Sequence, residues 1–291
     1  MKPDYKPFAP IPEFQNNYIA FTNNGISYLK DKKVIITGIV RDLDSKLLDN
    51  INQLKFLDKV CEKVNYFIYE NDSKDNTVSI LEHLRSDNSN FQFLSENIGS
   101  KKFGQVRDKE RMSNLSEARN KCHKYISKYY ADYDYVITID LDYDFVSYHG
   151  ILNSFGHFQT YNSSIDGICG SSYSLVWEKG REYIWNYDSF AFRLNHWTSL
   201  ENTVPEYYHQ NPSHWFGLWK PPIGSDLVLI NSGFGGCCIY KTSKYLQGKY
   251  GETDCEHVVF HKSIYDIGGF AMYLNPSQFI FTESESYKNK K

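Results

Sequence analysis

The feature of this sequence that most constrains its fold is an alternation of short apolar runs with amphipathic segments over residues 33–144. The apolar runs are rich in β-branched residues and have the length of strands, and the segments between them repeat their apolar side chains at helical spacing. The predicted strands cover residues 33–40, 66–70, 91–94 and 135–139. Strands that alternate with helices predict an α/β fold with a mostly parallel, Rossmann-type sheet flanked by helices.

The remainder of the chain is less regular. Residues 171–226 are rich in Tyr, Trp, Asn and His, a composition that favours packing over a flexible linker. Residues 1–32 are polar and contain several prolines, so we expect an irregular N-terminal arm. Further strands are predicted at residues 165–170, 226–230, 236–240 and 270–274, with a short helix from Cys255. We therefore predict one domain over residues 33–291, with the halves 33–144 and 145–291.

Composition argues against several classes of function. The chain has 291 residues and a net charge of −3, so no charge excess directs it to nucleic acid. No stretch has the length of a membrane span, and the N-terminus lacks the apolar core of a signal peptide. The six cysteines include no C-x-x-C pair, and their mostly apolar neighbours favour free thiols in a reducing compartment. We therefore expect a soluble, cytoplasmic protein without a transmembrane segment.

Three alternating carboxylates follow the last strand of the first half, in the run Asp140-Leu-Asp142-Tyr-Asp144. Side chains alternate along a strand, so the three acids would share one face if the extended geometry continued. Mutually repelling carboxylates are stabilised by a cation such as Mg²⁺ or Mn²⁺, typically with a phosphate in its shell. We expect Asp142 to be a metal ligand, Asp140 a second ligand or a ribose acceptor, and Asp144 to face solvent. The alternative is an acidic, solvated turn.

Polar residues also follow the earlier predicted strands. In sheets of this kind the ligand binds at the carboxyl ends of the strands, where Arg41, Glu70 and Asp72 lie together with the acids above. Glu70 and Asp72 are candidates to bind a nucleobase or ribose; alternatively, Asp72 caps the following helix. The common position of these residues favours a binding site at this edge.

Two helices contribute further candidates. Arg119 lies on the helix before the last strand of the first half and is a candidate to contact a diphosphate or an acceptor, unless it belongs to a solvated helix face. Glu256 is a candidate base for an acceptor hydroxyl, and His261, about one helical turn later, is a candidate nitrogen ligand of the metal. The alternative for both is the polar face of an amphipathic helix.

In this order the motifs resemble the GT-A glycosyltransferases. The residues that carry the resemblance are Arg41, the turn from Glu70 to Thr77, Ala118-Arg119-Asn120, and the run from Tyr135 to Asp142. The E-x-D-S-x-D-x-T form of the turn, with Cys255-Glu256-His257 and His261, is similar to the fungal capsule-associated mannosyltransferase group. That group often has a different residue before the metal-site acid, so the plain Asp-Leu-Asp of this chain leaves donor sugar and stereochemistry open.

The resemblance implies a nucleotide-diphosphate sugar as donor and a carbohydrate as acceptor. It implies a Mn²⁺ or Mg²⁺ ion held by the D-x-D motif, donor contacts from Arg41, Glu70 and Asp72, and an acceptor site built by the second half. We therefore predict a metal-dependent glycosyltransferase whose residues 33–144 bind the nucleotide sugar and whose residues 145–291 bind the acceptor. Glu256 would deprotonate the acceptor if the enzyme inverts configuration, and no base is required if it retains configuration.

Three alternatives stay open at this point. A nucleotidyltransferase would need a glycine-rich basic loop after the first strand, where this chain has Arg41-Asp-Leu-Asp-Ser. A haloacid-dehalogenase-type phosphatase also uses an Asp-x-Asp motif, but that motif follows the first strand. A non-catalytic carbohydrate-binding protein would keep the fold and lack the chemistry. Turnover of a nucleotide sugar separates this last alternative from an enzyme.

Overall fold

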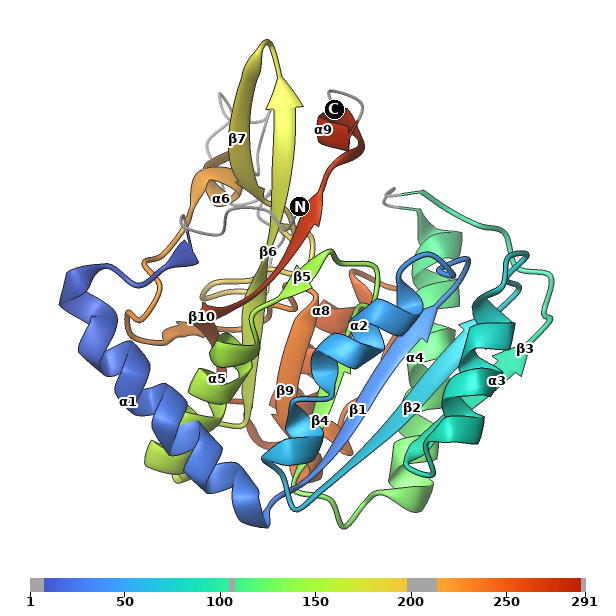
Figure 1. The fold of residues 1–291 in the computed structure, drawn as a ribbon, viewed down its shortest axis with the longest axis horizontal. Coiled ribbons are helices and arrows are strands. Elements are labelled where there is room, and N and C mark those ends of the chain that lie inside the picture. Colours follow the sequence, from blue (N-terminus) through green and yellow to red (C-terminus); the bar gives the residue numbers. More distant parts are fainter. Residues whose placement is uncertain (1–7, 105–107, 198–213, 289–291) are drawn as a thin grey trace.

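The computed structural model describes residues 8–104, 108–197 and 214–288, and a single mixed sheet forms its centre (Figure 1). The first half supplies β1 (Lys33–Val40), β2 (Lys63–Asn71), β3 (Phe91–Glu96) and β4 (Tyr135–Ile139). These strands lie in the order β3-β2-β1-β4 and all pair in parallel. The predicted parallel arrangement of the first half is thus confirmed, with strand ends that differ by at most three residues.

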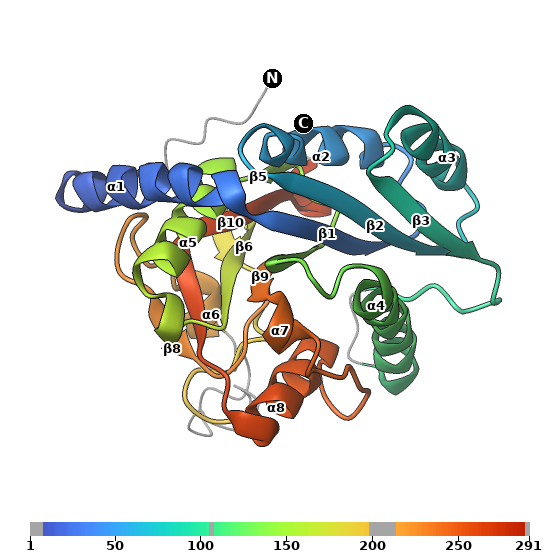
Figure 2. The same ribbon diagram turned by 90° about the horizontal axis from the view of Figure 1, so that it is seen from below.

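Helices cover both faces of this part of the sheet. They are α2 (Leu47–Leu54), α3 (Thr77–Asp87) and α4 (Lys109–Tyr129). Figure 2 shows α2 and α3 on one face and α4 on the other. Alternate residues of each strand serve the two faces: Val34 and Ile36 pack into the core under α2 and α3, whereas Ile35 packs into the core under α4. Burial on both faces explains why the strands are continuously apolar.

The second half extends the same sheet. Its strands are β5 (Phe145–Val146), β6 (Gly167–Glu178), β7 (Arg181–Asn186), β8 (Val228–Ile230), β9 (Cys237–Lys241) and β10 (Met272–Glu283). The full order is β3-β2-β1-β4-β9-β6-β10-β5, with β7 paired to β6 and β8 to β10. Because β9 runs antiparallel to both β4 and β6, the sheet is parallel only in part. The four strands predicted in this half overlap β6, β8, β9 and β10, whereas the sequence did not indicate β5 and β7.

Shorter helices complete the second half. They are α5 (Tyr148–Thr160), α6 (His214–Leu218), α7 (Thr242–Tyr245), α8 (Glu256–Gly268) and α9 (Glu285–Lys288), and 3-10 turns lie at Leu29–Asp31, Leu57–Lys59 and Asn162–Ser164. Helix α8 packs on the same face of the sheet as α4, so the two helices flank the ends of β4 and β9 (Figure 2). Across the three described stretches, no helix is both long enough and apolar enough to cross a membrane.

The expectation of an irregular N-terminal arm is wrong for residues 12–28, which form helix α1 (Pro12–Tyr28). This helix starts with Pro12 in its first turn, a position where the missing amide hydrogen costs nothing. It lies along α5 at close range: a Cβ on Gly25 would come within 1.8 Å of the Leu152 carbonyl oxygen, and one on Gly156 within 1.9 Å of that of Phe21. Tertiary packing on α5, rather than an apolar stripe in its own sequence, therefore stabilises α1.

Candidate active site

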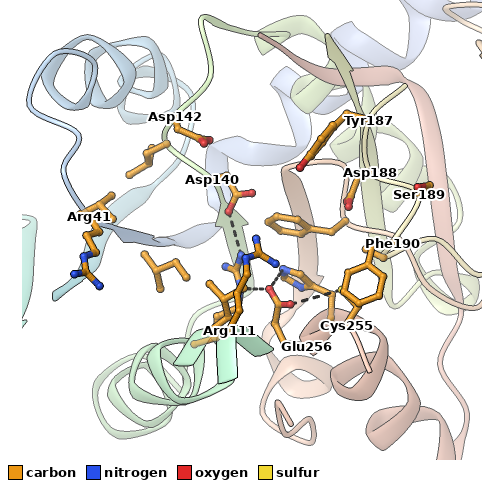
Figure 3. A pocket seen from close by; sticks show the side chains of 18 of the residues that line it. Arg41, Arg111, Asp140, Asp142, Tyr187, Asp188, Ser189, Phe190, Cys255 and Glu256 are labelled. Carbon is orange, nitrogen blue, oxygen red and sulfur yellow. Dashed lines mark hydrogen bonds and ion pairs between the residues drawn. The ribbon is translucent and has the colours of Figure 1, made fainter. Parts of the chain in front are cut away.

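A cavity of about 420 Å³ lies at the carboxyl ends of β1 and β4 (Figure 3). Figure 3 shows Arg41 and Asp142 on one side, Asp188 and Phe190 on the other, and Asp140 between them. The charged and polar groups that line it are Arg41, Arg111, Arg119, Asp140, Asp142, Tyr187, Asp188, Ser189, Glu256 and His257. A second cavity of about 290 Å³ adjoins it and is lined also by the last residue of β2 and by residues after β3. Because both cavities share Arg41, Arg111 and Asp142, they form one continuous groove.

The carboxylate-bearing loop after β4 is held firmly by α2. Strand β4 ends at Ile139, yet Leu141 and Tyr143 are still buried in the core, so the side-chain alternation continues. The buried Asn50 donates from Nδ2 to the carbonyl oxygens of Leu141 at 2.6 Å and Tyr143 at 2.8 Å. These contacts fix the backbone that turns Asp140 and Asp142 toward the cavity.

The third acid of the run has a structural contact instead. Asp144 does not line the cavity; its Oδ1 pairs with Lys46 Nζ at 2.7 Å, and its Oδ2 accepts from the backbone N–H of Glu283 at 2.8 Å. It is partly buried, so the expectation that Asp144 faces solvent is not met. Lys46 also donates to the carbonyl oxygen of Asp142 at 2.9 Å. Asp144 therefore helps to hold the loop on which the other two acids lie.

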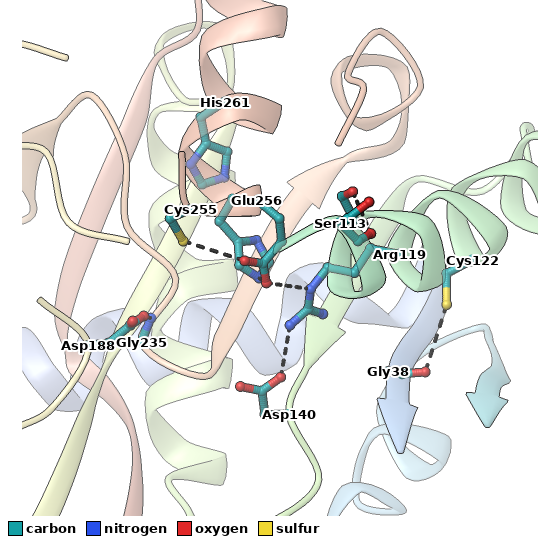
Figure 4. Close-up of polar contacts among 12 residues, drawn as sticks. Gly38, Ser113, Arg119, Cys122, Asp140, Asp188, Gly235, Cys255, Glu256 and His261 are labelled. Atoms are coloured by element: carbon teal, nitrogen blue, oxygen red, sulfur yellow. Dashed lines mark hydrogen bonds and ion pairs between the residues drawn. The ribbon is translucent and has the colours of Figure 1, made fainter. Parts of the chain in front are cut away.

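Arg119 is the centre of the site (Figure 4). Its Nε donates to Glu256 Oε1 at 3.1 Å, and its Nη2 donates to Asp140 Oδ1 at 3.0 Å. The guanidinium lies over the ring of Phe234 at 4.9 Å, and Nη1 has no hydrogen-bond partner among the described residues. The side chain is only 5% exposed, which excludes the solvated helix face considered above. Arg119 thus joins the loop after β4 to the start of α8.

The carboxyl group of Asp140 has an unusual protonation equilibrium. Burial raises its pKa to about 6, Arg119 opposes the rise, and the neighbouring Asp142 adds to it. Asp142 is exposed and lines both cavities. The two acids therefore differ: Asp140 is tied to a guanidinium, whereas Asp142 is open to solvent and to a ligand.

His257 has no ordinary partner in the described part of the chain. Its ring stacks on Phe234 with centroids 3.7 Å apart, and neither ring nitrogen makes a hydrogen bond there. Nε2 lies 3.6 Å from Glu256 Oε1. Burial keeps the pKa of His257 well below its usual value, and the nearby Arg119 lowers it further. The imidazole is therefore neutral at physiological pH and lines the cavity as a polar, uncharged group.

Asp188 was not among the predicted site residues. It follows β7 and reaches the cavity from the side opposite Arg41 (Figure 3). Its Oδ2 accepts from the backbone N–H of Gly235 at 2.7 Å. Burial raises the pKa of Asp188 to about 7, and the carboxylates of Asp140 and Glu256 contribute to the rise. Since neither β7 nor the loop after it follows a clear period in the sequence, no pattern marked this position.

Glu70 and Asp72 lie beside the groove rather than on its surface. Glu70 is buried, accepts from the Ser73 backbone N–H at 2.8 Å and also accepts from the hydroxyl of Ser95. Asp72, with a φ of 58°, accepts from the backbone N–H groups of Gly99 at 2.8 Å and Ser100 at 3.0 Å. It does not cap α3, which begins at Thr77. Glu70 and Asp72 therefore shape the loops that line the smaller cavity.

The surroundings of His261 do not fit the expectation that it is a metal ligand. It is fully buried, its Nδ1 lies 2.8 Å from Ser232 Oγ, and its Nε2 lies 2.9 Å from Tyr240 Oη. Burial lowers its pKa to about 3. One turn along α8 from His257, it points into the core beneath the cavity and does not line it (Figure 4). With both ring nitrogens engaged, His261 has no lone pair free for a cation beside Asp142.

The acids of the cavity fit a cation that a substrate helps to hold. Within the described residues, no three His, Cys, Asp or Glu side chains are placed to bind a metal by themselves. Asp140 and Asp142 nevertheless both line the cavity. Mg²⁺ and similar cations commonly bind through one or two carboxylates, with phosphate oxygens and water in the remaining positions. Two carboxylates beside a groove thus suit a cation completed by a bound phosphate group.

Comparison with family models and with curated proteins finds no match to this sequence. Solved structures do match. The mannosyltransferase PcManGT from Pyrobaculum calidifontis, in complex with GDP-Man and Mn²⁺, has a TM-score of 0.50 and 10% identity, over 96% of this chain and 68% of PcManGT. GalNAc-T7 with UDP, GalNAc and Mn²⁺ has a TM-score of 0.50 and 11% identity, over 99% of this chain and 56% of that protein.

S. aureus TarS 1–349 has a TM-score of 0.49 and 15% identity, over 86% of this chain and 60% of TarS. The chain therefore spans less than two thirds of the length of TarS and of GalNAc-T7. The fold shared with PcManGT and GalNAc-T7 is the GT-A fold, which confirms the predicted fold class. At identities of 10% and 11%, what the chain shares with these glycosyltransferases is their fold. No comparison bears on the fungal capsule-associated group, so that finer assignment stays a prediction.

Proposed function

We propose that this protein is a metal-dependent glycosyltransferase that moves a sugar from a nucleotide-diphosphate donor to a hydroxyl group of a carbohydrate or similar acceptor. One observation carries the proposal: Arg119, Asp140 and Asp142 line a single groove at the carboxyl ends of β1 and β4, with Glu256 beside them. This is where open α/β sheets bind their ligands. Two proteins with the same fold, PcManGT and GalNAc-T7, were solved with GDP-Man or UDP and with Mn²⁺, which supports this class of donor.

The smaller cavity suits the nucleoside part of such a donor. Arg41 Nη1 donates to Ser100 Oγ at 3.0 Å, and Asn71 Nδ2 donates to the same oxygen at 2.8 Å. Both side chains line the cavity, and Nε of Arg41 has no partner within the described residues. Donors and acceptors of this kind recognise ribose hydroxyls or base edges. Glu70 and Asp72 would contribute by fixing these loops, and the diphosphate would extend from Arg41 toward Arg119.

Asp142 and Asp140 would hold the cation. When bound, a Mn²⁺ or Mg²⁺ ion supplies charge stabilisation to the diphosphate leaving group. Because Arg119 already occupies Oδ1 of Asp140, the open carboxylate of Asp142 is the more available ligand. Asp140 would bind through its other oxygen and keep its contact with Arg119. We do not assign His261 to the metal, since Ser232 and Tyr240 engage both of its nitrogens.

A thermal-shift screen of nucleotides and nucleotide sugars, with and without Mn²⁺, tests this proposal. A ligand that binds only the folded state stabilises it by about 2.7 kcal/mol at a concentration one hundred times its Kd. We expect nucleoside diphosphates and one nucleotide sugar to raise the melting temperature more with Mn²⁺ than without it. The nucleotide sugar that raises the melting temperature would identify base and sugar together. It would therefore also test the resemblance to the fungal capsule-associated mannosyltransferase group.

Two variants make the screen specific. Asp142→Ala should abolish the Mn²⁺-dependent part of the shift and leave the melting temperature of the free protein nearly unchanged, because Asp142 is exposed. Asp144→Asn is the matched control, since that acid does not line the groove: it should lower the melting temperature of the free protein and keep the ligand-induced shift. Absence of any shift with every nucleotide, or an unchanged shift in Asp142→Ala, would refute the proposal.

A further inference from the structure

We propose that Asp188 is the catalytic base of this enzyme, and that Glu256 is a positioning residue that holds Arg119. The inference rests on the proposed function and deepens it, because it names the group that receives the proton of the acceptor hydroxyl. It also predicts that transfer inverts the configuration of the anomeric carbon, since retaining transfer requires no such base.

The surroundings of Glu256 oppose a role as base. Its side chain is only 6% exposed, and Oε1 accepts from Arg119 Nε at 3.1 Å. The thiol of Cys255 lies against Oε2 at 3.6 Å. Both carboxylate oxygens of Glu256 therefore already have a neighbour, Arg119 on one and the Cys255 thiol on the other, which leaves little room for an acceptor hydroxyl. What Glu256 does instead is fix the guanidinium that also binds Asp140.

Asp188, in contrast to Glu256, is not paired with a guanidinium of the described residues. It lines the cavity from the side of the second half, and in the described residues no Lys, Arg or His forms an ion pair with it. Its Oδ2 is oriented by the backbone N–H of Gly235 at 2.7 Å. Gly235 is fixed in turn: its φ is +56°, and a Cβ there would lie 2.0 Å from the carbonyl oxygen of Gly170. The backbone N–H groups of Gly235 and Ala191 thus orient a carboxyl group that lines the cavity.

The loop that carries Asp188 is held rigidly against α8. The fully buried Arg193 donates from Nη1 to the carbonyl oxygens of Phe190 at 3.0 Å and Phe192 at 2.8 Å. Its Nη2 contacts both carboxylate oxygens of Asp254, at 2.9 and 2.7 Å. Asp254 directly precedes Cys255, the N-cap residue of α8. A base must be placed within hydrogen-bond reach of the proton that it removes, and these contacts provide a fixed position.

The charges around Asp188 support the assignment. Burial raises its pKa to about 7, near the pH at which a general base is most effective. Two backbone N–H groups, of Gly235 and Ala191, work against this rise. Titratable groups that interact with it come from the loop after β4, β6, its own loop and the start of α8; they are Asp140, Cys169, Tyr187, Cys255 and Glu256. Arg41, Arg111 and Arg119 also line the cavity, and none of them forms an ion pair with Asp188 in the described part of the chain.

The proposed step balances as follows. The acceptor hydroxyl oxygen forms a bond to the anomeric carbon while the bond from that carbon to the diphosphate oxygen breaks. The electron pair of the broken bond leaves with the nucleoside diphosphate. The carboxylate of Asp188 takes the hydroxyl proton, and Asp188 releases it to solvent after the products leave.

Asp188→Asn and Glu256→Gln separate the two roles. The Asn variant keeps an oxygen for the Gly235 amide but cannot take a proton. We would assay a panel of UDP-, GDP- and CDP-sugars with Mn²⁺ by release of the nucleoside diphosphate, with water and methyl glycosides as acceptors. General-base catalysis contributes about 10²- to 10⁴-fold, so Asp188→Asn should lower kcat at least 100-fold with little change in donor KM. Glu256→Gln should mainly raise donor KM.

The pH profile adds a readout that a structural role would not move. The rate of the unaltered enzyme should fall on the acidic side with an apparent pKa near 7; Glu256→Gln should keep this limb and Asp188→Asn should lose it. If kcat of Asp188→Asn is within threefold of that of the unaltered enzyme, or if transfer retains the anomeric configuration, the assignment of the base is wrong while the proposed function still stands. If Asp188→Asn does not fold, an unaltered enzyme without the acidic limb overturns it equally. An unaltered protein that turns over no donor refutes the proposed function, and this assignment with it.

Discussion

The groove has two walls that are built in different ways. The first, which would bind the donor under the proposed function and is called the donor wall (Arg41, Asp140 and Asp142), consists of residues that follow β1 and β4, two neighbouring parallel strands. The second, which would face the acceptor and is called the acceptor wall (residues 187–191, Phe234, Glu256 and His257), comes from three segments that are distant in the sequence. Parallel strands bring their carboxyl ends to one edge by geometry alone, whereas the distant segments need specific side-chain contacts to assemble. The donor wall thus follows from the topology of the sheet, and the acceptor wall depends on buried arginines.

Arg119 joins the two walls, so its removal should have the largest effect. Arg119→Ala leaves Glu256 buried without its cation and removes the guanidinium from Asp140. Breaking one partner of a buried ion pair typically costs about 3–5 kcal/mol, and we expect a loss of that size in the free energy of unfolding. Chemical denaturation would measure it.

Arg111→Ala is the matched control for this prediction. Arg111 lies on the same helix and lines the same cavity but is only partly buried. We expect it to change the free energy of unfolding by less than about 1 kcal/mol. If the two variants were equally stable, Arg119 would not be the link between the walls.

The same contrast explains what could be predicted from the sequence. The sequence could place Arg41, Asp140 and Asp142 at the edge that lines the groove, because a strand pattern ends just before these residues and the end of a parallel strand is a defined place. For Arg119 the sequence left a solvated helix face open, because helical spacing does not reveal which buried acids an arginine contacts. Asp188 was missed, since its position depends on Gly235 and on contacts between segments that no local pattern records.

Two other errors have the same origin. Helix α1 was expected to be irregular because its stabilisation comes from α5, through the close approach at Gly25. His261 was expected to be a metal ligand because spacing on a helix gives the direction of a side chain but not the depth at which it is buried. In both cases the missing information is tertiary: which element lies opposite, and how near it comes.

The acceptor wall offers the next largest effect. Arg193→Ala removes the contacts that tie the loop after β7 to Asp254 and to the carbonyl oxygens of Phe190 and Phe192. We expect a loss of about 3 kcal/mol in the free energy of unfolding, because buried carbonyl oxygens lose their donor. The exposed Arg181 on β7 provides the control, and Arg181→Ala should be close to neutral. Faster proteolysis of the loop at residues 187–197 in Arg193→Ala alone would strengthen the comparison.

The donor wall should be less sensitive to loss of a single side chain. Asn50→Ala removes the donor to the carbonyl oxygens of Leu141 and Tyr143, and we expect it to cost about 2 kcal/mol. Asn52→Ala, on the exposed side of the same helix, should cost less than about 0.5 kcal/mol. Urea denaturation of both variants measures the difference. A larger loss for Asn50→Ala than for Arg193→Ala would contradict the view that the sheet itself supports the donor wall.

The smallest expected effect is a pH dependence of stability that comes from Asp188 in the acceptor wall. Burial raises the pKa of Asp188 to about 7, so between its unfolded value and pH 7 the folded state binds a proton that the unfolded state has lost. The contribution of this group to stability is therefore present at low pH and is lost as the pH rises through 7. The side chain in Asp188→Asn does not titrate, so only the unaltered protein loses this contribution as the pH rises. The difference in free energy of unfolding, Asp188→Asn minus unaltered, should therefore increase from pH 5 to pH 8. Because Asp188 is partly exposed to solvent, we expect an increase of only about 1 kcal/mol. Denaturation of both proteins at the two pH values, without ligand, measures it; a constant or decreasing difference would mean that the acceptor wall does not hold this carboxyl group in its protonated form.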